Sequence, residues 1–433
     1  MPHVWQCHEH VVRVTGGRPL TGSVTVQGSK NIALHLYAAA QLADEPLTLT
    51  GTPEILDTVV CTEILNRTGT VAKASTDRFE TMPGVGWHHA IPDDLGRRVR
   101  TTAVMAAALL TRTGEVTFPL PGGDAFCPRY IDRHLAAMEA AGATVDVNGG
   151  RVRARLDRGK PAPFTIDTGT RWGPSLGATV TAMLLAARVH GTSTIFRPSI
   201  EPEVTTTAEL LARSGVDVEW EGTTALRING SDRIAGGTFA VPPDRMEAAT
   251  LALAAAISGG HVHLAGFPVS GFPDGLLAAF ADAGLELVPA AEGTMVRCPG
   301  GPRATLAATG PHPDFPTDAQ PQFTALLTQA PGTSRIQERV FPSRATHTGP
   351  LRALGAIVNA TGPAITVRGP TRLIAADIVG KDIRAATALV IAALAAEGTS
   401  TIRGMYHLRR GYAGLLPKLA ALGARLTIDE ETP

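Results

Sequence analysis

The chain of 433 residues carries 39 basic and 39 acidic side chains and has a formal net charge of zero. A chain of this length is too long for one ordinary hydrophobic core, so we expect two or three domains. The balanced charge disfavours a general role on nucleic acids or on a membrane surface, since both need a positive field. It leaves room for a small local cluster of arginine and lysine.

Cysteine usage and the N-terminal residues indicate the cellular compartment. The cysteines form no CxxC pair, which disfavours a disulfide framework or a zinc knuckle and favours a reducing cytoplasm. They stand at Cys7, Cys61, Cys127 and Cys298. The first residues lack the pattern of a signal peptide, and the apolar stretches are far shorter than the roughly 20 residues that span a bilayer. The run CHEH at Cys7–His10 has metal-ligating residue types, but a polar N-terminal segment is the favoured interpretation.

In chain order, the first predicted element is a strand at Val11–Val14, and a turn follows at Gly16–Pro19. After it, an amphipathic stretch that ends in glycine and leads into a β-branched run recurs six times, about 70 residues apart. Glycine at that place is typical of the residue that ends a helix with positive φ before a strand. These glycines are Gly69, Gly142, Gly215, Gly284, Gly355 and Gly423.

An alanine-rich helix is predicted ahead of each of these stretches. The six helices are apolar on most faces, so we expect them to be buried. They span Asn31–Ala43, Thr101–Arg112, Gly177–Val189, Met246–Ser258, Asp318–Ala330 and Ile383–Ala396.

Each repeat would hold two helices and several strands, enough for a small layered module. Six such modules pack most simply as two globes of three, with the chain crossing between them near Gly237–Asp244. The alternative is that similar helix ends recur by chance in a chain rich in alanine and glycine. The near-equal spacing disfavours that alternative.

Common nucleotide and metal motifs are absent from the sequence: there is no GxxxxGK[ST], no GxGxxG after a predicted strand and no HExxH. His261 and His263 alternate on one face of a predicted strand, where structural histidines are the favoured interpretation.

Basic residues at the ends of predicted elements are the strongest candidates for a site. Lys30, Arg100 and Arg384 each stand at the start of an alanine-rich helix, where a cation and the helix dipole together suit a phosphate or a carboxylate. Further arginines lie in loops and turns, at Arg129, Arg344 and Arg410. Solvated surface positions, the fate of most arginines and lysines, are the alternative for each.

Two acids also occupy helix starts, Asp318 and Asp382. Aspartate is a good N-cap, which is the structural interpretation. A capping carboxylate is also held rigidly enough to act as a base, so the two interpretations are compatible.

Taken together, seven motifs resemble the enolpyruvyl transferase family, and within it the UDP-N-acetylglucosamine 1-carboxyvinyltransferase branch. The resemblance covers nearly the whole chain. Its motifs are GSKNIAL (28–34), LPGGDAFCPRYIDRH (120–134), PSLGAT (174–179), EPEV (201–204), PHPDFPTDAQ (311–320), DIRA (382–385) and YHLRRGY (406–412).

The resemblance implies an α/β fold, a two-domain inside-out α/β barrel of six βαβαββ repeats with three repeats per domain. It places domain one at residues 30–243 and domain two at residues 1–29 plus 244–433, with the active site in the interdomain cleft. It implies phosphoenolpyruvate and a uridine nucleotide as substrates, and neither a cofactor nor a metal.

The resemblance also assigns roles to single residues. Lys30, Arg100 and Arg129 would bind the phosphate of phosphoenolpyruvate, and Arg344, Arg384 and Arg410 its carboxylate. Asp318 would be the base that takes the acceptor proton, while Asp382 would help to stabilise the cationic centre and manage protons, close to Lys30 as a further catalytic residue. The acceptor-binding residues would be Asn31, Arg129, Asp132, His134, Ser175, Leu176, Gly177, Asp318 and Arg344. Closure of the domains and of the loop at 121–129 would exclude water.

One departure from the family falls in the loop. Many members have cysteine directly after LPGG, where this chain has Asp124. A carboxylic acid can supply the same proton, so we expect Asp124 to be the general acid. The inhibitor fosfomycin alkylates that cysteine, so we expect resistance, and Cys127 is not expected to substitute for it.

Other departures concern the acceptor. Where the family has Arg-Pro-Val-Asp-Leu-His, this chain has RYIDRH at Arg129–His134. Gly173 stands where the family has a basic residue, and Val104 stands where it has an aromatic residue. Residues 72–96 match the family poorly. UDP-N-acetylglucosamine, in peptidoglycan synthesis, is the default acceptor. The 3′-hydroxyl of UMP, in the synthesis of peptidyl-nucleoside antibiotics, is the alternative. A catalytically inactive relative is a further alternative, which is disfavoured because the charged residues persist. A 5-enolpyruvylshikimate-3-phosphate synthase is another, which is disfavoured because the FPTDAQ and RGY contexts differ from that enzyme.

Overall fold

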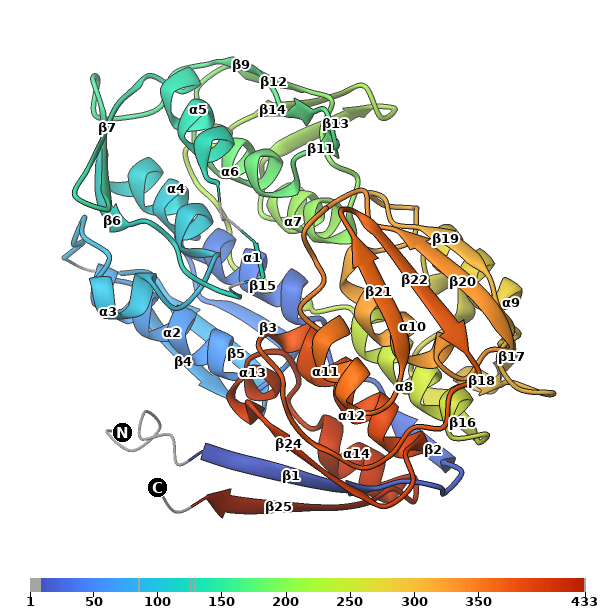
Figure 1. Ribbon diagram of the computed structural model, residues 1–433. Coiled ribbons are helices and arrows are strands. Elements are labelled where there is room, and N and C mark those ends of the chain that lie inside the picture. Colours follow the sequence, from blue (N-terminus) through green and yellow to red (C-terminus); the bar gives the residue numbers. More distant parts are fainter. Residues whose placement is uncertain (1–8, 85, 125, 128–129, 432–433) are drawn as a thin grey trace. The chain divides into compact units, whose positions relative to one another are not determined.

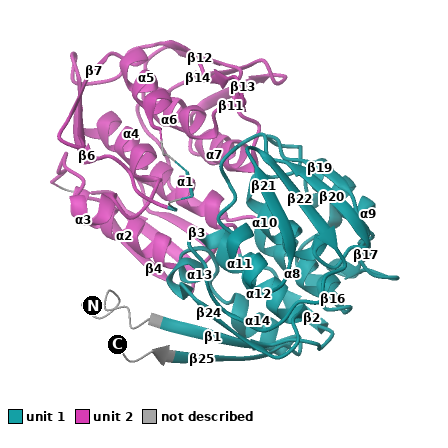
Figure 2. Cartoon of the chain, in the orientation of Figure 1, with its two compact units in different colours: residues 1–27, 124–127, 243–433 teal, residues 28–123, 128–242 magenta. Residues whose placement is uncertain are grey.

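The computed structural model describes residues 9–431 except 85, 125 and 128–129 (Figure 1). The chain divides into two compact units, coloured separately in Figure 2. Unit 1 consists of Met1–Gln27, Asp124–Cys127 and Pro243–Pro433, and unit 2 of Gly28–Gly123 and Pro128–Pro242. The run CHEH at 7–10 lies partly outside the described residues.

Unit 2 holds three sheets of three or four strands within its described residues. The first contains β3 (Leu47–Thr52), β4 (Val71–Ser75), β5 (Asp77–Met82) and β15 (Gly237–Ala240). The second contains β6 (Glu115–Pro119), β7 (Ala143–Asn148) and β8 (Arg151–Leu156). The third contains β9 (Thr165–Asp167), β12 (Thr192–Phe196), β13 (Asp217–Glu221) and β14 (Ala225–Asn229), and β10 (Gly169–Thr170) pairs separately with β11 (Gly173–Pro174). The helices are α1 (Lys30–Ala40), α2 (Leu56–Thr68), α3 (Asp93–Gly96), α4 (Thr102–Thr113), α5 (Asp132–Ala140), α6 (Leu176–Ala186) and α7 (Pro202–Arg213).

Unit 1 holds three four-stranded sheets within its described residues. The first contains β2 (Thr21–Thr25), β16 (His261–Ala265), β17 (Glu286–Ala290) and β18 (Gly293–Arg297). The second contains β19 (Leu306–Ala308), β20 (Gly332–Gln337), β21 (Ile357–Thr361) and β22 (Ala364–Gly369). The third contains β1 (Glu9–Thr15), β23 (Asp377–Val379), β24 (Thr399–Arg403) and β25 (Arg425–Glu431). The helices are α8 (Arg245–Ile257), α9 (Asp274–Asp282), α10 (Gln320–Leu327), α11 (Thr348–Ala353), α12 (Ile383–Ala395), α13 (Met405–Gly411) and α14 (Leu415–Ala421), with 3₁₀ turns at Val269–Gly271 and Thr317–Ala319.

The alanine-rich helices form the centre of each unit, as the sequence predicts. In unit 1, α8, α10 and α12 pack against one another, and in unit 2 both α1 and α6 pack against α4. Every residue of α8 from Met246 to Ile257 is buried, as is every residue of α12 from Ile383 to Leu394. Alanine side chains allow the helices to approach closely, so these helices are buried on most of their faces. No helix in the described part of the chain is long and apolar enough to cross a membrane.

The repeated glycines end helices, and their φ angles confirm the prediction. Each follows a helix and has a φ between 92° and 111°, a region that disfavours residues with a Cβ. The six are Gly69 after α2, Gly142 after α5, Gly215 after α7, Gly284 after α9, Gly355 after α11 and Gly423 after α14.

Two parallel strand pairs between distant parts of the chain set the positions of the crossings between units. β2 pairs with β16, which ties the N-terminal segment into unit 1, and β15 pairs with β3, which closes the first sheet of unit 2. Apart from the short segment Asp124–Cys127, the chain therefore leaves unit 1 after Gln27 and returns to it at Pro243. The first and last described strands, β1 and β25, pair antiparallel and lie side by side (Figure 1).

Candidate functional site

In unit 1, the Asp318 carboxylate lies between two arginines. Its Oδ1 accepts a hydrogen bond from Arg344 Nη1 at 2.7 Å and its Oδ2 from Arg384 Nη2 at 2.7 Å. The arginine side chains are only 3% and 7% exposed, whereas that of Asp318 is 26% exposed. Burial by itself would raise the pKa of the Asp318 carboxyl, but the guanidinium groups of Arg384 and Arg344 together hold it well below its usual range. The carboxylate is therefore anionic, accessible and fixed.

Local structure explains how these three residues meet. Asp318 lies in the 3₁₀ turn Thr317–Ala319 and makes no capping hydrogen bond, so the capping interpretation was wrong for this residue. Arg384 is the second residue of α12, and its Nη1 donates to the Tyr412 hydroxyl at 3.0 Å. Arg344 Nη1 also donates to Thr317 Oγ1 at 3.0 Å. Both guanidinium groups thus have a second partner that fixes their planes.

Asp382 is the N-cap of α12, as the sequence predicts. Its Oδ1 accepts from the backbone N–H groups of Arg384 and Ala385 at 3.0 and 2.9 Å. Its Oδ2 accepts from the hydroxyl of Thr346, and the residue is 2% exposed. One oxygen of the carboxylate therefore holds the helix while the other faces the turn that carries Arg344.

The segment Asp124–Cys127 belongs to unit 1, although the chain on either side of it belongs to unit 2. Asp124 Oδ1 accepts from Arg410 Nη1 at 2.8 Å, with His407 Nδ1 3.8 Å away, and the Asp124 and Arg410 side chains are 11% and 6% exposed. Phe126 stacks on the Arg344 guanidinium at 3.9 Å. The same short segment therefore contributes an acid that pairs with Arg410 and an aromatic ring that stacks on Arg344.

Glycines ahead of this segment are required by the path of the chain. A Cβ on Gly122 would lie 1.6 Å from the Arg97 carbonyl oxygen, and Gly123 has a φ of +116°. The LPGG run thus permits a tight turn directly before Asp124.

In unit 2, the structure places Lys30 and Asn31 as the first two residues of α1, behind the N-cap Ser29. Lys30 Nζ pairs with Asp57 Oδ2 at 2.9 Å, and the two side chains are 10% and 6% exposed. Arg100 is exposed and precedes α4. Together with the larger effect of burial, its positive charge lowers the pKa of His134 to about 3.

Five of the residues expected to bind the acceptor lie at the starts of α5 and α6. Ser175 is the N-cap of α6, and Leu176 and Gly177 follow as its first turn. His134 Nδ1 lies 2.7 Å from Thr181 Oγ1 on the same helix, and a Cβ on Gly177 would lie 2.6 Å from His134 Nε2. Asp132 begins α5 with a side chain 70% exposed. Arg129 lies outside the described residues.

The sequence analysis did not single out several residues that contact these side chains. They are Asp57, Phe126, Thr250, Phe341, Thr346, His407 and Tyr412. Among them, Thr250 hydrogen-bonds to the Tyr412 hydroxyl, and Phe341 lies beside the Arg344 guanidinium. Tyr412 stood inside a quoted motif, and its aromatic ring beside an arginine-rich helix was a usable signal. Asp57 and Thr346 carried no such signal, because their partners are distant in sequence.

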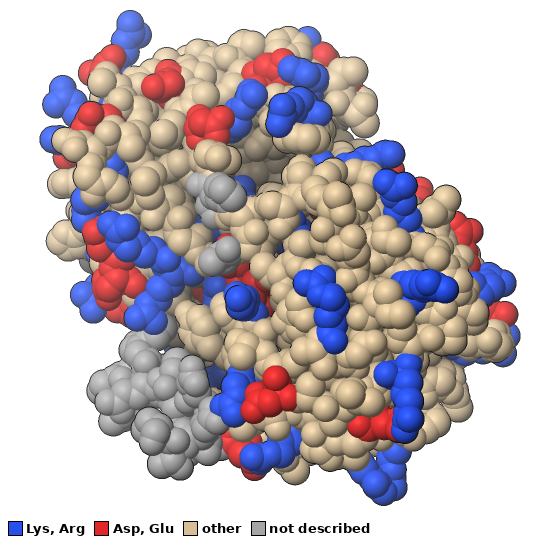
Figure 3. Space-filling view, viewed as in Figure 1, with Lys and Arg blue, Asp and Glu red and all other residues tan. Residues whose placement is uncertain are grey.

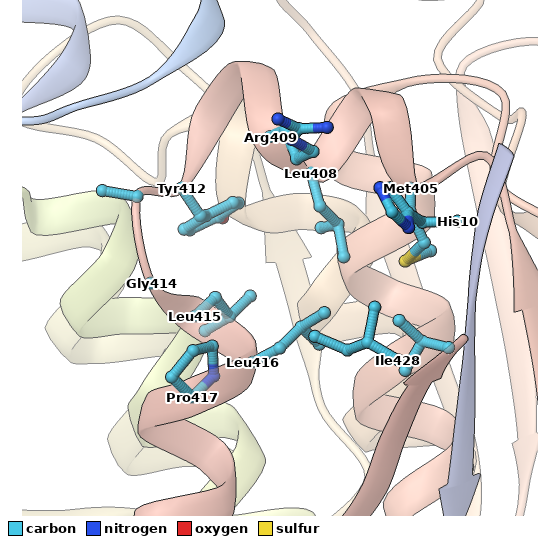
Figure 4. A pocket seen from close by; sticks show the side chains of 12 residues that line it. His10, Met405, Leu408, Arg409, Tyr412, Gly414, Leu415, Leu416, Pro417 and Ile428 are labelled. Carbon is cyan, nitrogen blue, oxygen red and sulfur yellow. The ribbon is translucent and has the colours of Figure 1, made fainter. Parts of the chain in front are cut away.

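A separate apolar pocket lies in unit 1 between α13, α14 and strands β1 and β25 (Figure 4). Met405, Leu408, Leu415 and Ile428 line it, and none of the predicted site residues does. Basic and acidic side chains are interspersed on the face shown in Figure 3, without a continuous basic surface. Among the described residues, no group of three or more His, Cys, Asp or Glu side chains is arranged to hold a metal ion.

Comparison with known proteins gives matches over nearly the whole chain. The family model "EPSP synthase (3-phosphoshikimate 1-carboxyvinyltransferase)" matches residues 14–419. A UDP-N-acetylglucosamine 1-carboxyvinyltransferase of Caulobacter vibrioides is 39% identical over 427 residues, which cover 96% of this chain and 97% of the relative. The protein of that name from Nitratidesulfovibrio vulgaris is 36% identical over 96% of this chain and 99% of its own length.

Solved structures agree with these matches. The crystal structure of the enolpyruvyl transferase NikO from Streptomyces tendae has a TM-score of 0.88 and 26% identity, and covers 98% of this chain and 100% of that one. An EPSP synthase from Acinetobacter baumannii has a TM-score of 0.75 at 16% identity and covers 97% of this chain and 100% of that one, which shows the shared fold. The fold is therefore the two-domain inside-out α/β fold of these enzymes, as predicted.

Proposed function

The chain belongs to the EPSP synthase family of enolpyruvyl transferases, and from this premise we propose that it transfers the enolpyruvyl group of phosphoenolpyruvate to a hydroxyl of a uridine nucleotide and releases phosphate. The observation that carries the proposal is the cluster in unit 1. There, the accessible Asp318 carboxylate lies between two buried arginines, and a second acid, Asp124, pairs with a third arginine of the same unit.

Phosphoenolpyruvate presents a carboxylate and a phosphate, so its binding needs several cations. Guanidinium groups bind carboxylates in a bidentate geometry, which suits Arg344, Arg384 and Arg410 to the substrate carboxylate. We assign Lys30, Arg100 and Arg129 to the phosphate.

The residues of the cluster suit an addition followed by an elimination. Asp124, as the acid, donates a proton to C3 of phosphoenolpyruvate, which leaves positive charge at C2. Asp318, as the base, takes the proton of the acceptor hydroxyl while its oxygen attacks C2 and forms a tetrahedral phospho-ketal. Loss of phosphate and of one C3 proton then forms the enol ether. The Asp382 carboxylate, as an anion, stabilises the positive charge at C2, and Asp382 and Lys30 take part in these proton transfers.

The two arginines at Asp318 raise a question about its basicity, because a carboxylate with a strongly depressed pKa is a weak base. The carboxylate of phosphoenolpyruvate competes for the same guanidinium groups. When the substrate carboxylate shares the hydrogen bonds of Arg344 and Arg384, Asp318 loses part of their stabilisation and becomes more basic. Substrate binding therefore activates the base.

UDP-N-acetylglucosamine is the acceptor that we propose first, because relatives more than one third identical carry its name. A specific observation favours UMP as a second candidate. Lys30, Asp318, Asp382 and the arginines persist, whereas residues around the acceptor contacts, such as Gly173, depart from the family pattern.

The experiment is an assay of phosphate release from phosphoenolpyruvate with UDP-N-acetylglucosamine, UMP and shikimate-3-phosphate offered in parallel. We expect release with one of the two uridine nucleotides. Release with shikimate-3-phosphate alone, or with none of the three, would remove the proposed acceptor class.

A further inference from the structure

Gln27 lies where the chain leaves unit 1, between the end of β2 and the start of α1. Its backbone N–H donates to Glu247 Oε2 at 2.6 Å, and its carbonyl accepts from the N–H of Asp244 at 2.7 Å. The Glu247 side chain is fully buried and accepts from Lys418 Nζ at 2.8 and 2.7 Å. Charge-assisted hydrogen bonds therefore anchor the main chain at this point.

The Gln27 carboxamide binds the backbone on both sides of Tyr412. Its Oε1 accepts from the N–H of Ala413 at 2.8 Å, and its Nε2 donates to the carbonyl of Gly411 in a longer contact of 3.4 Å. A primary amide has both a donor and an acceptor, so this one side chain satisfies two backbone groups two residues apart.

The segment held in this way carries side chains of the candidate site. Arg410 donates to Asp124 at 2.8 Å, and the Tyr412 hydroxyl accepts from Arg384 at 3.0 Å. Arg384 in turn donates to Asp318 at 2.7 Å. Arg410, which binds Asp124, therefore adjoins the segment bound by Gln27. Tyr412, which binds Arg384 and through it affects Asp318, lies within that segment.

We propose that Gln27 is a positioning residue for the transfer reaction, whose carboxamide holds Gly411–Ala413 and thereby orients Arg410 and Tyr412. This inference rests on the proposed function. Gln27 touches none of the reacting groups and acts through Arg410 and Tyr412.

The surroundings of Gln27 leave its backbone little freedom. A Cβ on Gly28 would lie 1.6 Å from the Gly51 carbonyl oxygen, and the N–H of Ser29 donates to the Pro242 carbonyl at 2.7 Å. Lys30 follows directly as the first residue of α1. The segment 27–30 therefore has two roles. Gln27 fixes the backbone next to Arg410, and Lys30 begins α1.

The test uses Gln27→Met, which keeps the size of the side chain and removes both hydrogen bonds. Since small displacements of a catalytic group cost up to about 100-fold in rate, we expect kcat to fall on the order of tenfold, with the acceptor KM little changed. Gln329→Met is the matched control. Gln329 is another partly buried amide of unit 1, and it donates to Thr328 and to the Thr371 carbonyl. We expect its kcat to equal that of the wild type.

A mutant cycle separates positioning from general destabilisation. If Gln27 acts through Arg410 and Tyr412, Gln27→Met lowers kcat by less than about twofold in a background that carries both Arg410→Lys and Tyr412→Phe, whereas independent effects multiply in full. Hydrogen exchange of the peptide 405–414 should also be faster in Gln27→Met than in Gln329→Met.

Three results would each overturn the inference: a wild-type kcat in Gln27→Met, a full loss that persists when both Arg410→Lys and Tyr412→Phe are present, or unchanged exchange in the peptide 405–414. Should the wild-type enzyme transfer no enolpyruvyl group, the proposed function fails. The exchange measurement still decides whether Gln27 holds the segment.

Discussion

At the scale of single residues, Asp124 is the position where the sequence resemblance implies a cysteine in many members of the family. A carboxyl group and a thiol can both donate a proton, but only a thiolate is a good nucleophile toward an epoxide. We expect Asp124→Cys to keep activity within about tenfold of the wild type and Asp124→Asn to lose on the order of 100- to 10,000-fold.

Fosfomycin distinguishes the same variants. The wild-type enzyme should recover full activity after incubation with millimolar inhibitor and its removal, whereas Asp124→Cys should be inactivated irreversibly. Irreversible inactivation of the wild type would contradict the role given to Asp124 and would point to Cys127.

Asp318→Asn removes the proposed base. General base catalysis contributes on the order of 100- to 10,000-fold, so kcat should fall by that factor while the fold persists. The control is Asp377→Asn, which breaks an exposed ion pair with Arg403 on the edge strand β23. Exposed pairs contribute at most about 1 kcal/mol, so the control should keep both activity and stability. A kcat for Asp318→Asn near that of the control would exclude its role as a base.

Two buried histidines predict how stability depends on pH. Burial is the main cause that lowers the pKa of both His134 and His347 to about 3, and nearby arginines lower it further. Because an unfolded histidine titrates near pH 6.5, the unfolded state binds more protons below that pH. Their contribution to stability is therefore complete above about pH 6.5 and is lost as the pH falls toward 3, by about 1.4 kcal/mol per pH unit for each histidine.

Denaturant unfolding at several pH values measures this effect. His347→Gln should show a shallower loss of unfolding free energy between pH 6.5 and 5 than the wild type. An identical slope would mean that His347 is protonated in the folded state.

At the scale of elements, α12 serves both structure and chemistry, because Asp382 caps it while Arg384 extends from its first turn. Losing an N-cap costs about 1 kcal/mol, and serine caps nearly as well as aspartate. Asp382→Ala should therefore lose both stability and activity, whereas Asp382→Ser should keep stability and lose activity. Thermal unfolding and kcat measured on both variants separate the two roles. Full activity in Asp382→Ser would reduce Asp382 to a cap.

A buried charge pair links α8 and α14. Its partners are Glu247 on α8 and Lys418 on α14. Removing one partner of such a pair costs about 3–5 kcal/mol, because the other charge stays buried without compensation. Lys418→Met should therefore lower the free energy of unfolding by about that amount, and Lys418→Arg should restore most of it. Burial raises the pKa of Glu247, and the charge of Lys418 opposes that rise. A small loss in Lys418→Met would mean that Glu247 is neutral in the folded protein and would contradict the charge pair.

The sequence predicted the elements well where the signal is local. Six alanine-rich helices and six helix-ending glycines follow from periodicity and from the need for positive φ, and the structure confirms them. Asp318 was misjudged as a possible cap, because a helix start in sequence resembles the 3₁₀ turn that it occupies.

At the scale of the whole molecule, the sequence could not predict which distant residues meet. Asp57 and Lys30 are 27 positions apart, and Gln27 and Ala413 are 386 apart. Such contacts depend on strand pairs such as β2 with β16, which no local pattern specifies. The family resemblance supplied the list of charged residues, while their partners, Tyr412 and Thr346 among them, required the structure.

The central claim is that paired acids and clustered arginines perform an addition followed by an elimination. Its most direct test is the reaction run in D₂O with the accepting nucleotide, with the product analysed by NMR. The account predicts deuterium in the vinyl group of an enol ether, because C3 of phosphoenolpyruvate is protonated and then deprotonated. A product without deuterium in that group, or phosphate released without an enol ether, would contradict it.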